Sequence, residues 1–371
     1  MKRLALLAGL CAAAGAQAQT AGAALQQCAA TADNAARLAC YDQLASQQAW
    51  SAPPASAQAA TPAAAPAPAL PPEQTAPVEL ARIDGCRDPQ FSAISRFWEL
   101  SNDTDCGTFS FRSYRPMTVA VVAGSSVNDQ PSSPSAGHTP ASPVDYRKQE
   151  MRIQLSLRTK LAQGLLTDAN GTRKDSIWFG YTQQSYWQLF SPGISRPFRA
   201  TDHEPEVMYV YPTDAHLPFG WRWRYSGVGL VHQSNGQSLP LSRSWNRWYL
   251  MTGMELGSQW QVHARAWKRI QESAANDDNP DITDYMGRGE LRVVWTPSDQ
   301  NTFSATLRSS FGHTGRASAR LEWMTPLGKG LGGAKSNLRL HTALFSGYGE
   351  NMTDYNYKRT TFSIGLSLVD F

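Results

Sequence analysis

Residues 361–371 read TFSIGLSLVDF, and this stretch decides the fold class. Large apolar side chains stand at every second position from Phe362 to Leu368, with small or polar residues between them. A period of two places the apolar residues on one face of a β-strand and the polar residues on the other. The stretch therefore predicts a strand with one apolar side and one polar side.

The same alternation runs through the chain upstream of this strand, for example over residues 149–163 and 335–347. An even number of such strands suits an antiparallel sheet that closes into a barrel. Counted by this pattern, twelve strands are predicted near residues 108–122, 149–164, 174–190, 204–213, 219–234, 245–257, 259–272, 285–296, 302–311, 316–326, 335–347 and 358–371.

A soluble β-sandwich also alternates apolar and polar residues, so the period alone leaves two fold classes open. Three features favour a membrane barrel: the strands are long, Trp and Tyr cluster near strand ends, and the chain ends on the aromatic residue Phe371. Residues 108–371 are therefore predicted to form an all-β, 12-stranded antiparallel transmembrane β-barrel.

The composition is compatible with this fold and argues against a helical membrane protein and a nucleic-acid-binding protein. No internal stretch approaches about 18 consecutive apolar residues, so a transmembrane helix is not predicted. Barrel strands expose only alternate residues to lipid, which agrees with the low mean hydropathy of −0.41. The net charge of +4 comes without a basic run, so we expect no nucleic-acid partner.

The N-terminus has the pattern of a secretory signal peptide. Lys2 and Arg3 precede an apolar run over residues 4–16, and a small-x-small cleavage site ends at Ala18. Residues 1–18 are therefore predicted to be removed. Cys11 lies inside this segment and follows Leu10, a poor match to a lipoprotein signal, so lipidation is not expected.

The four cysteines that remain are expected to form disulfides, because the count is even and the compartment is oxidising. The pairs Cys28 with Cys40 and Cys86 with Cys106 are the simplest of the three possible connectivities.

Before the barrel, the chain divides into three predicted segments. Residues 19–50 read as a small cysteine-pinned helical module, in which residues 25–46 place their apolar side chains mostly on one helix face. Residues 51–80 are rich in Pro and Ala and predict an extended linker. Residues 81–107 are predicted to be a periplasmic N-terminal segment.

A candidate catalytic group stands at the end of the predicted strand 219–234. His232 and Ser234 are two residues apart, so their side chains share one face, and a serine nucleophile needs such an adjacent base. Asn246, just inside the next strand, can orient the imidazole across the hairpin. By itself the pair also fits a polar strand end, since His-x-Ser is a common sequence and position 232 lacks the Gly of the G-x-S-x-G motif.

The pair continues an apolar row formed by Val228 and Leu230, which faces lipid in a barrel. A catalytic pair on the outer wall makes sense if the substrate is itself a lipid. Earlier in the strand, the aromatic residues from Phe219 to Tyr225 occupy the other parity, so a change of phase is expected near Ser226.

Several motifs together resemble one family, outer membrane phospholipase A. The resemblance covers residues 97–371 and leaves residues 19–85 without a match. The motifs are YTQQSYWQL (181–189), PFR (197–199), EP (204–205), HQSNG (232–236), SRSWNR (242–247), DDNPDIT (277–283) and SGYGE (346–350).

The resemblance implies a twelve-stranded outer-membrane barrel that cleaves acyl esters of phospholipids and lysophospholipids, depends on Ca²⁺ and is active as a homodimer. It assigns Ser234 as the nucleophile, His232 as the base and Asn246 as the residue that orients it. The backbone N–H of Gly236 would contribute to the oxyanion hole, together with a water polarised by calcium.

The resemblance also implies about one calcium ion per monomer, at the dimer interface. Its ligands would be the hydroxyl of Ser242, the backbone carbonyl of Gln237 and the hydroxyl of Ser195 of the partner subunit. A site with so few carboxylates binds weakly, which would let dimerisation switch the activity.

Two positions depart from the family pattern. Gln237 stands where Arg is frequent, but only its carbonyl is needed. Leu239 stands where an Asp of an additional calcium site is common, which puts that site in doubt although Asp278 matches its other carboxylate. The acidic loop 277–284 is not an EF-hand and also fits a solvated loop.

Gln183 is the predicted dimer contact. It shares a face with Ile177, Phe179 and Tyr181, which places an amide in an apolar, lipid-facing row. An unpaired amide in hydrocarbon is costly, so the simplest partner is Gln183 of a second subunit. The alternatives are an amide that reaches the membrane interface, or a parity that is wrong by one residue.

Two other functions remain open. The first is a non-enzymatic porin or adhesin with the same fold, and the second is a hydrolase that removes acyl chains from lipopolysaccharide.

Overall fold

The computed structural model describes residues 27–31, 33–47, 85–168, 170–311, 315–328 and 337–368. The chain divides into two compact units, Met1–Val78 and Glu79–Phe371, and each is described by itself. The predicted signal peptide 1–18 and linker 51–80 lie outside the described residues and stay predictions. No described helix is long and apolar enough to cross a membrane.

The described part of the first unit contains helix α2 (Asn34–Gln47) and a disulfide between Cys28 and Cys40, whose Cα atoms are 5.6 Å apart. The prediction of one continuous helix over residues 25–46 is therefore wrong. Residues twelve apart in a helix are separated by about 18 Å, so the disulfide requires the chain to turn before α2. The second disulfide joins Cys86 to Cys106, which confirms the simplest of the three connectivities.

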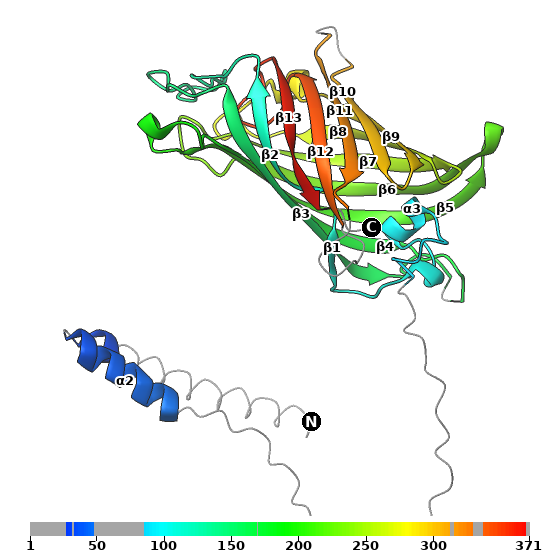
Figure 1. The fold of residues 1–371 in the computed structure, drawn as a ribbon, viewed down its shortest axis with the longest axis horizontal. Helices are drawn as coiled ribbons and strands as arrows, with labels where there is room; N and C mark the ends of the chain where they lie inside the picture. Colours follow the sequence, from blue (N-terminus) through cyan, green and yellow to red (C-terminus); the bar gives the residue numbers. More distant parts are fainter. Residues whose placement is uncertain are drawn as a thin grey trace, which may run out of the picture. The chain divides into compact units, whose positions relative to one another are not determined.

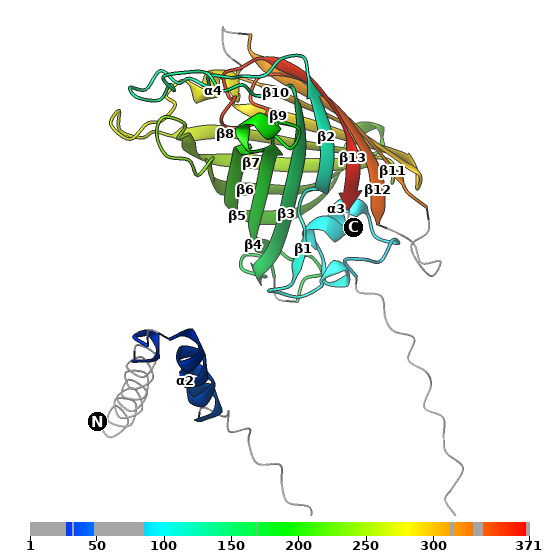
Figure 2. The same cartoon turned by 60° about the vertical axis from the view of Figure 1, so that its left-hand side comes forward.

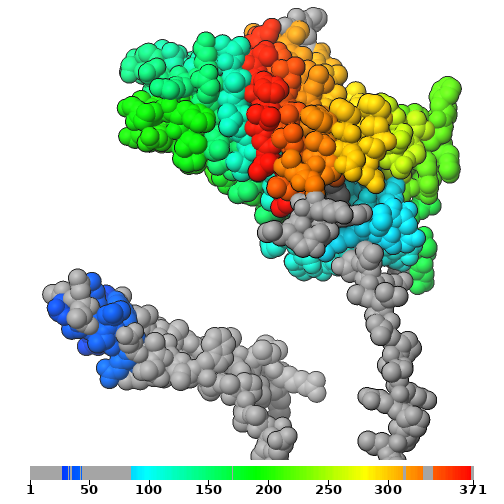
Figure 3. Space-filling view, viewed as in Figure 1, coloured from blue at the N-terminus to red at the C-terminus, as the bar shows by residue number. Residues whose placement is uncertain are grey.

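In the second unit, twelve antiparallel strands form a closed barrel, as predicted (Figure 1). The ring closes where β13 pairs with β2. On its other side β13 pairs with β12, and Figure 3 shows β13 in red between these two strands. The strands are β2 (Met117–Gly124), β3 (Gln149–Gln163), β4 (Ser176–Trp187), β5 (Phe198–His216), β6 (Trp221–Ser234), β7 (Ser244–Leu256), β8 (Trp260–Ile270), β9 (Gly289–Ser298), β10 (Asn301–Ser309), β11 (Ala317–Pro326), β12 (Leu338–Gly347) and β13 (Arg359–Leu368).

The predicted first strand, 108–122, is in fact broken into β1 (Phe111–Ser113) and β2. Both pieces pair with β3, β1 through Phe111 opposite Thr159 and β2 through Thr118 opposite Gln154. Pro116 lies between them and has no N–H for the ladder, which accounts for the break. The strand expected near 285–296 begins only at Gly289, because helix α4 (Ile282–Tyr285) precedes it.

The barrel is apolar outside and polar inside. Along β13, Phe362, Ile364, Leu366 and Leu368 are exposed, whereas Thr361, Ser363 and Ser367 are buried in the lumen. Charged side chains pair inside the barrel: the Arg199 guanidinium lies 2.5 Å from Glu150 and 2.7 Å from Asp354. A sandwich would bury the apolar face, so this arrangement excludes that alternative.

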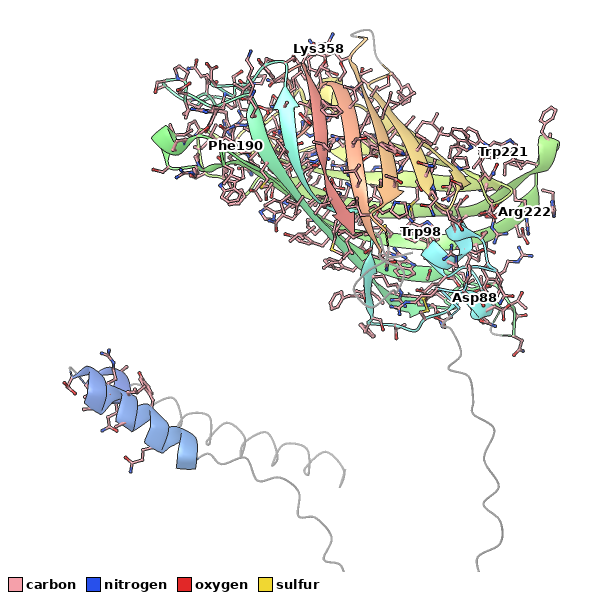
Figure 4. The ribbon with its side chains drawn as sticks, viewed as in Figure 1. Asp88, Trp98, Phe190, Trp221, Arg222 and Lys358 are labelled. Atoms are coloured by element: carbon pink, nitrogen blue, oxygen red, sulfur yellow. A yellow bond between two sulfur atoms is a disulfide. The ribbon has the colours of Figure 1, made fainter. Side chains whose placement is uncertain are left out.

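Helix α3 (Ala93–Trp98) and the short helix η1 (Asn102–Thr104) lie at one end of the barrel, beside β1 (Figure 2). Trp98 is only 2% exposed, and its ring lies 5.9 Å from that of Trp178 and 5.6 Å from that of Tyr225. In Figure 4, Trp98 and the start of β6 at Trp221 are at the opposite end from Phe190, which follows β4. We call the described residues 85–113 the plug and the other end of the barrel, where β6 finishes at Ser234, the site end.

Candidate active site

The outward row on β6 contains the expected change of phase. A β-bulge shifts the β6–β7 register between Trp223, opposite Met254, and Tyr225, opposite Gly253. Trp223 is therefore exposed and Tyr225 buried, while Leu230 beyond the bulge is exposed again. The bulge lies just before Ser226 and so confirms the predicted position.

His232 and Asn246 are directly opposite each other in the β6–β7 ladder. The His232 Nδ1 lies 2.8 Å from the Asn246 Oδ1. An amide oxygen only accepts, so Nδ1 carries the proton and donates it, which leaves Nε2 with a free lone pair. Ser234 is the next residue of β6 on this outward face, and among the described residues its hydroxyl has no hydrogen-bond partner.

The loop after Ser234 is organised by Asn235, which is only 3% exposed. Its Oδ1 accepts from the N–H of Arg243 at 3.0 Å, and its Nδ2 donates to the carbonyl of Leu241 at 2.6 Å. Gly236 adopts a φ of +61°, a left-handed conformation that glycine adopts without strain. Its N–H donates no hydrogen bond within the part of the chain that the structure describes.

Ser242 lies at the far end of this loop, beside an acidic residue from another loop. Its hydroxyl donates to Asp278 Oδ2 at 2.7 Å, and the hydroxyl of Ser244 lies 3.3 Å from the same oxygen. The other carboxylate oxygen of Asp278 lies 3.0 Å from His138 Nε2. The hydroxyls of Ser242 and Ser244 and the carboxylate of Asp278 are oxygen donors of the kind that calcium prefers. Gln237 lies in the same loop as Ser242.

Ser195 is on a different loop, between β4 and β5, directly after the short helix η2 (Pro192–Ile194), and it is exposed. No group of three His, Cys, Asp or Glu side chains with metal-binding geometry occurs among the described residues. The resemblance implies a calcium site made of hydroxyl and carbonyl oxygens, and this site stays a prediction.

The acidic loop 277–284 is packed and not simply solvated. The hydroxyls of Ser133 and Ser135, from the loop between β2 and β3, donate to the carbonyls of Asp278 and Asp277. Asn279 is fully buried. Tyr355 donates to Asp281 at 2.5 Å, and burial together with this bond raises the pKa of the Tyr355 phenol above its ordinary value. These contacts fix the position of Asp278 relative to Ser242.

Gln183 lies on the outward face of β4, so its predicted parity is right. Within one chain its amide has two long contacts: the Tyr181 hydroxyl donates to Oε1 at 3.3 Å, and Nε2 donates to Ser185 at 3.3 Å. Both exceed the usual distance for such bonds, which leaves the amide weakly satisfied.

Two neighbours of His232, Ser234 and Asn246 could not be identified from local sequence patterns. His203 on β5 is directly opposite Ser234, and its Nδ1 lies 2.8 Å from the Tyr181 hydroxyl. Glu272, after β8, accepts a hydrogen bond from Asn246 Nδ2 at 2.7 Å. The register of β5 against β6 would have predicted the position of His203. The position of Glu272 depends on the conformation of the loop after β8.

The chain is similar to known proteins in sequence and in fold. A model of the family described as phospholipase A1 matches residues 94–368. A putative phospholipase A1 from Neisseria meningitidis is 36% identical over 389 residues, which covers 99% of this chain and 96% of the relative.

The structure also matches outer membrane phospholipase A from Escherichia coli, with a TM-score of 0.60 and 32% identity, over 71% of this chain and 100% of that one. One solved form of that enzyme is an active-site mutant in which an asparagine is replaced by alanine. An outer membrane phospholipase from Salmonella typhi, solved as a dimer with bound calcium, matches with a TM-score of 0.60 and 34% identity, over 71% of this chain and 93% of that one. The chain belongs to the phospholipase A1 family and is an outer-membrane β-barrel protein.

Proposed function

We propose that the protein is a calcium-dependent phospholipase A1/A2 that hydrolyses acyl esters of phospholipids and lysophospholipids and acts as a homodimer. The observation that carries this proposal is the 2.8 Å contact between His232 and Asn246, on the same outward face as Ser234. An oriented imidazole beside a serine is the arrangement of a serine esterase.

The position of the triad favours a lipid substrate. Val228 and Leu230 continue the row of Ser234 along the outer wall, and both are exposed. Acyl chains of a membrane lipid can lie along this row, with the ester near Ser234 at the site end of the barrel. A soluble substrate would gain nothing from such a surface.

In the proposed acylation, the Ser234 Oγ attacks the ester carbonyl carbon while His232 Nε2 takes the hydroxyl proton. The resulting oxyanion accepts a hydrogen bond from the Gly236 N–H. The C–O bond to glycerol then breaks, and His232 returns the proton to the leaving alkoxide, which releases a lysophospholipid.

Deacylation repeats these steps with water. His232 takes a proton from water, the hydroxide adds to the acyl-serine, and the proton passes to the Ser234 Oγ as the fatty acid leaves. Catalytic hydrogen bonds often form only when substrate is bound. We therefore expect the Ser234 hydroxyl to reach His232 in that complex, by rotation about χ1.

Calcium fits the oxygen-rich surroundings of Ser242. We assign as its ligands the Ser242 hydroxyl, the Gln237 carbonyl and the hydroxyl of Ser195 of the partner subunit, at about one ion per monomer. When bound, the ion supplies positive charge beside the developing oxyanion and polarises a water molecule there. Asp278 supports the site by accepting a 2.7 Å hydrogen bond from the Ser242 hydroxyl. The calcium and the dimer in the Salmonella typhi relative support this assignment.

The alternative of a passive porin or adhesin has less support. Interior charges are paired across the lumen, as in the 2.6 Å contact of Arg115 with Glu204, which does not favour an open pore. Head-group analysis of the deacylated products would separate phospholipid hydrolysis from removal of acyl chains from lipopolysaccharide.

The test is acyl release from phospholipid by the refolded mature protein, with Ca²⁺ and with chelator. We expect calcium-dependent release that Ser234→Ala abolishes. Because two histidines adjoin Ser234, His232→Gln and His203→Gln form a matched pair of variants. The first should lose about 10³-fold or more in kcat and the second less than about tenfold. If a folded, dimeric wild type released no acyl chains, the assignment of the barrel fold would stand but the proposed enzymatic function would be wrong.

A further inference from the structure

We propose that Glu272 is a positioning residue that extends the Ser-His-Asn triad by a fourth member. The inference rests on the proposed function of Ser234, His232 and Asn246. Glu272 would act through Asn246, by fixing the orientation of its amide and by placing a negative charge behind it.

The geometry places Glu272 next to the triad from a separate element. Asn246 is opposite Ile270, the last residue of β8, and Glu272 follows two positions later. Its Oε1 accepts from Asn246 Nδ2 at 2.7 Å, a short distance that is typical of an N–H bonded to a charged acceptor. Glu272 is half-buried, so water only partly screens this bond.

The contact decides which way the Asn246 amide points. An ionised carboxylate can only accept hydrogen bonds, so Glu272 must face the NH₂ group of Asn246. The Oδ1 is then directed to the other side, where it lies 2.8 Å from His232 Nδ1. This orientation holds the His232 proton on Nδ1 and leaves Nε2 as the base for Ser234.

The charge of Glu272 has a second effect. When His232 takes the serine proton it becomes positive, and its immediate partner Asn246 is neutral. In a Ser-His-Asp triad the carboxylate contacts the imidazole directly. Here the carboxylate is one amide further away, and the two hydrogen bonds in series polarise each other. Glu272 therefore stabilises the charged imidazole through Asn246.

Nearby charges do not compete for this role. Arg269, three residues earlier, is engaged by Asp277 at 2.5 Å and by the carbonyls of Asn279 and Pro280. Asp284, later in the same connection, pairs with Arg288 at 3.2 Å. Asp284→Asn removes one negative charge from this loop without touching the triad, which makes it a matched control.

The first experiment measures kcat and KM for Glu272→Gln, Glu272→Ala and Asp284→Asn in the calcium-loaded dimer. Gln can accept the same hydrogen bond but has no charge. We expect both Glu272 variants to lose about tenfold in kcat with KM within about twofold of wild type, and Asp284→Asn to be unchanged. If kcat of Glu272→Gln equalled that of the wild type, the proposed role of the Glu272 charge would be wrong.

A double-mutant cycle with Asn246→Asp sharpens the test. That variant alone would set two carboxylates against each other, and Glu272→Gln would relieve the repulsion. The double variant Asn246→Asp with Glu272→Gln should therefore exceed Asn246→Asp in kcat by about tenfold or more. Additive effects of the two substitutions would overturn the proposed coupling.

The ¹⁵N chemical shifts of the His232 ring report the tautomer without any turnover. We expect a proton fixed on Nδ1 in the wild type and in Ser234→Ala, and a mixture of tautomers in Glu272→Ala. An unchanged tautomer in Glu272→Ala would overturn the positioning role. Failure of the proposed function has a separate signature, which is acyl release that survives Ser234→Ala.

Discussion

The Ser242 hydroxyl donates a 2.7 Å hydrogen bond to Asp278, which lies 36 residues further along the chain. The bond joins the loop after β6 to the loop after β8. Because the hydroxyl proton points to the carboxylate, the oxygen lone pairs of Ser242 are left for another partner. His138 and Ser244 hold Asp278 in place, so the direction of the Ser242 hydroxyl is set before any cation binds.

We predict that Asp278→Asn weakens calcium binding more than it affects the chemical step. The variant keeps an acceptor for Ser242 but removes the negative charge, so the Ca²⁺ concentration for half-maximal activity should rise about tenfold or more. A calcium titration of acyl release, together with calorimetry, measures this shift. Asp277→Asn removes a charge one residue away, and an equal shift in that variant would contradict a specific role for Asp278.

The plug should contribute to stability without touching the site. Trp98 is 2% exposed and packs against Trp178 and Tyr225. Trp98→Ala should lower the free energy of unfolding by about 3–5 kcal/mol, because it leaves a large cavity. Denaturant unfolding in lipid vesicles measures the loss, with the exposed Phe111→Ala as the control. Equal stabilities for the two variants would show that Trp98 does not anchor the plug.

The sequence predicts the strands well because each strand separates lipid from a polar lumen along its length. That contrast fails where the chain leaves the membrane wall. Pro116 breaks the first strand, α4 replaces the start of another, and β5 begins at Phe198, six residues before its predicted start. The error in the N-terminal helix has a different cause, since the disulfide of Cys28 with Cys40 is a constraint that helical periodicity ignores.

The juxtaposition of His232, Ser234 and Asn246 on adjacent strands was also predictable. His232 and Ser234 need only the two-residue period, and Asn246 needs only a hairpin. By contrast, His138 reaches Asp278 across 140 residues. Glu272 depends on how the chain turns after β8. Loop conformations of this kind follow from tertiary packing, which local sequence patterns do not contain.

Gln183 should report the dimer interface directly. Its amide faces outward with two 3.3 Å contacts, so a second subunit can improve its hydrogen bonding. We expect Gln183→Cys to cross-link to a dimer in the presence of calcium and substrate. Leu321→Cys, on the exposed face of β11, is the control and should not form a cross-link. Cross-linking through Leu321→Cys alone would move the interface to the other side of the barrel.

The plug should also lose stability in acid through Asp105. Partial burial would raise the pKa of this carboxyl, but hydrogen bonds from Lys160, Gln163 and the Gly107 N–H outweigh it and lower the pKa to about 2. A carboxyl whose pKa is lowered by folding stabilises the folded state at pH values above its ordinary pKa of about 3.9. This contribution disappears as the pH falls to the pKa of the carboxyl in the folded state.

Asp105→Asn should therefore be less stable than the wild type at neutral pH. The difference should stay constant down to about pH 5, shrink between about pH 4 and about pH 2, and vanish below that. Thermal unfolding followed by circular dichroism at a series of pH values measures the difference, with the exposed Asp103→Asn as the control. A difference that persists unchanged at about pH 2 would mean that the substitution acts through packing and not through the charge of Asp105.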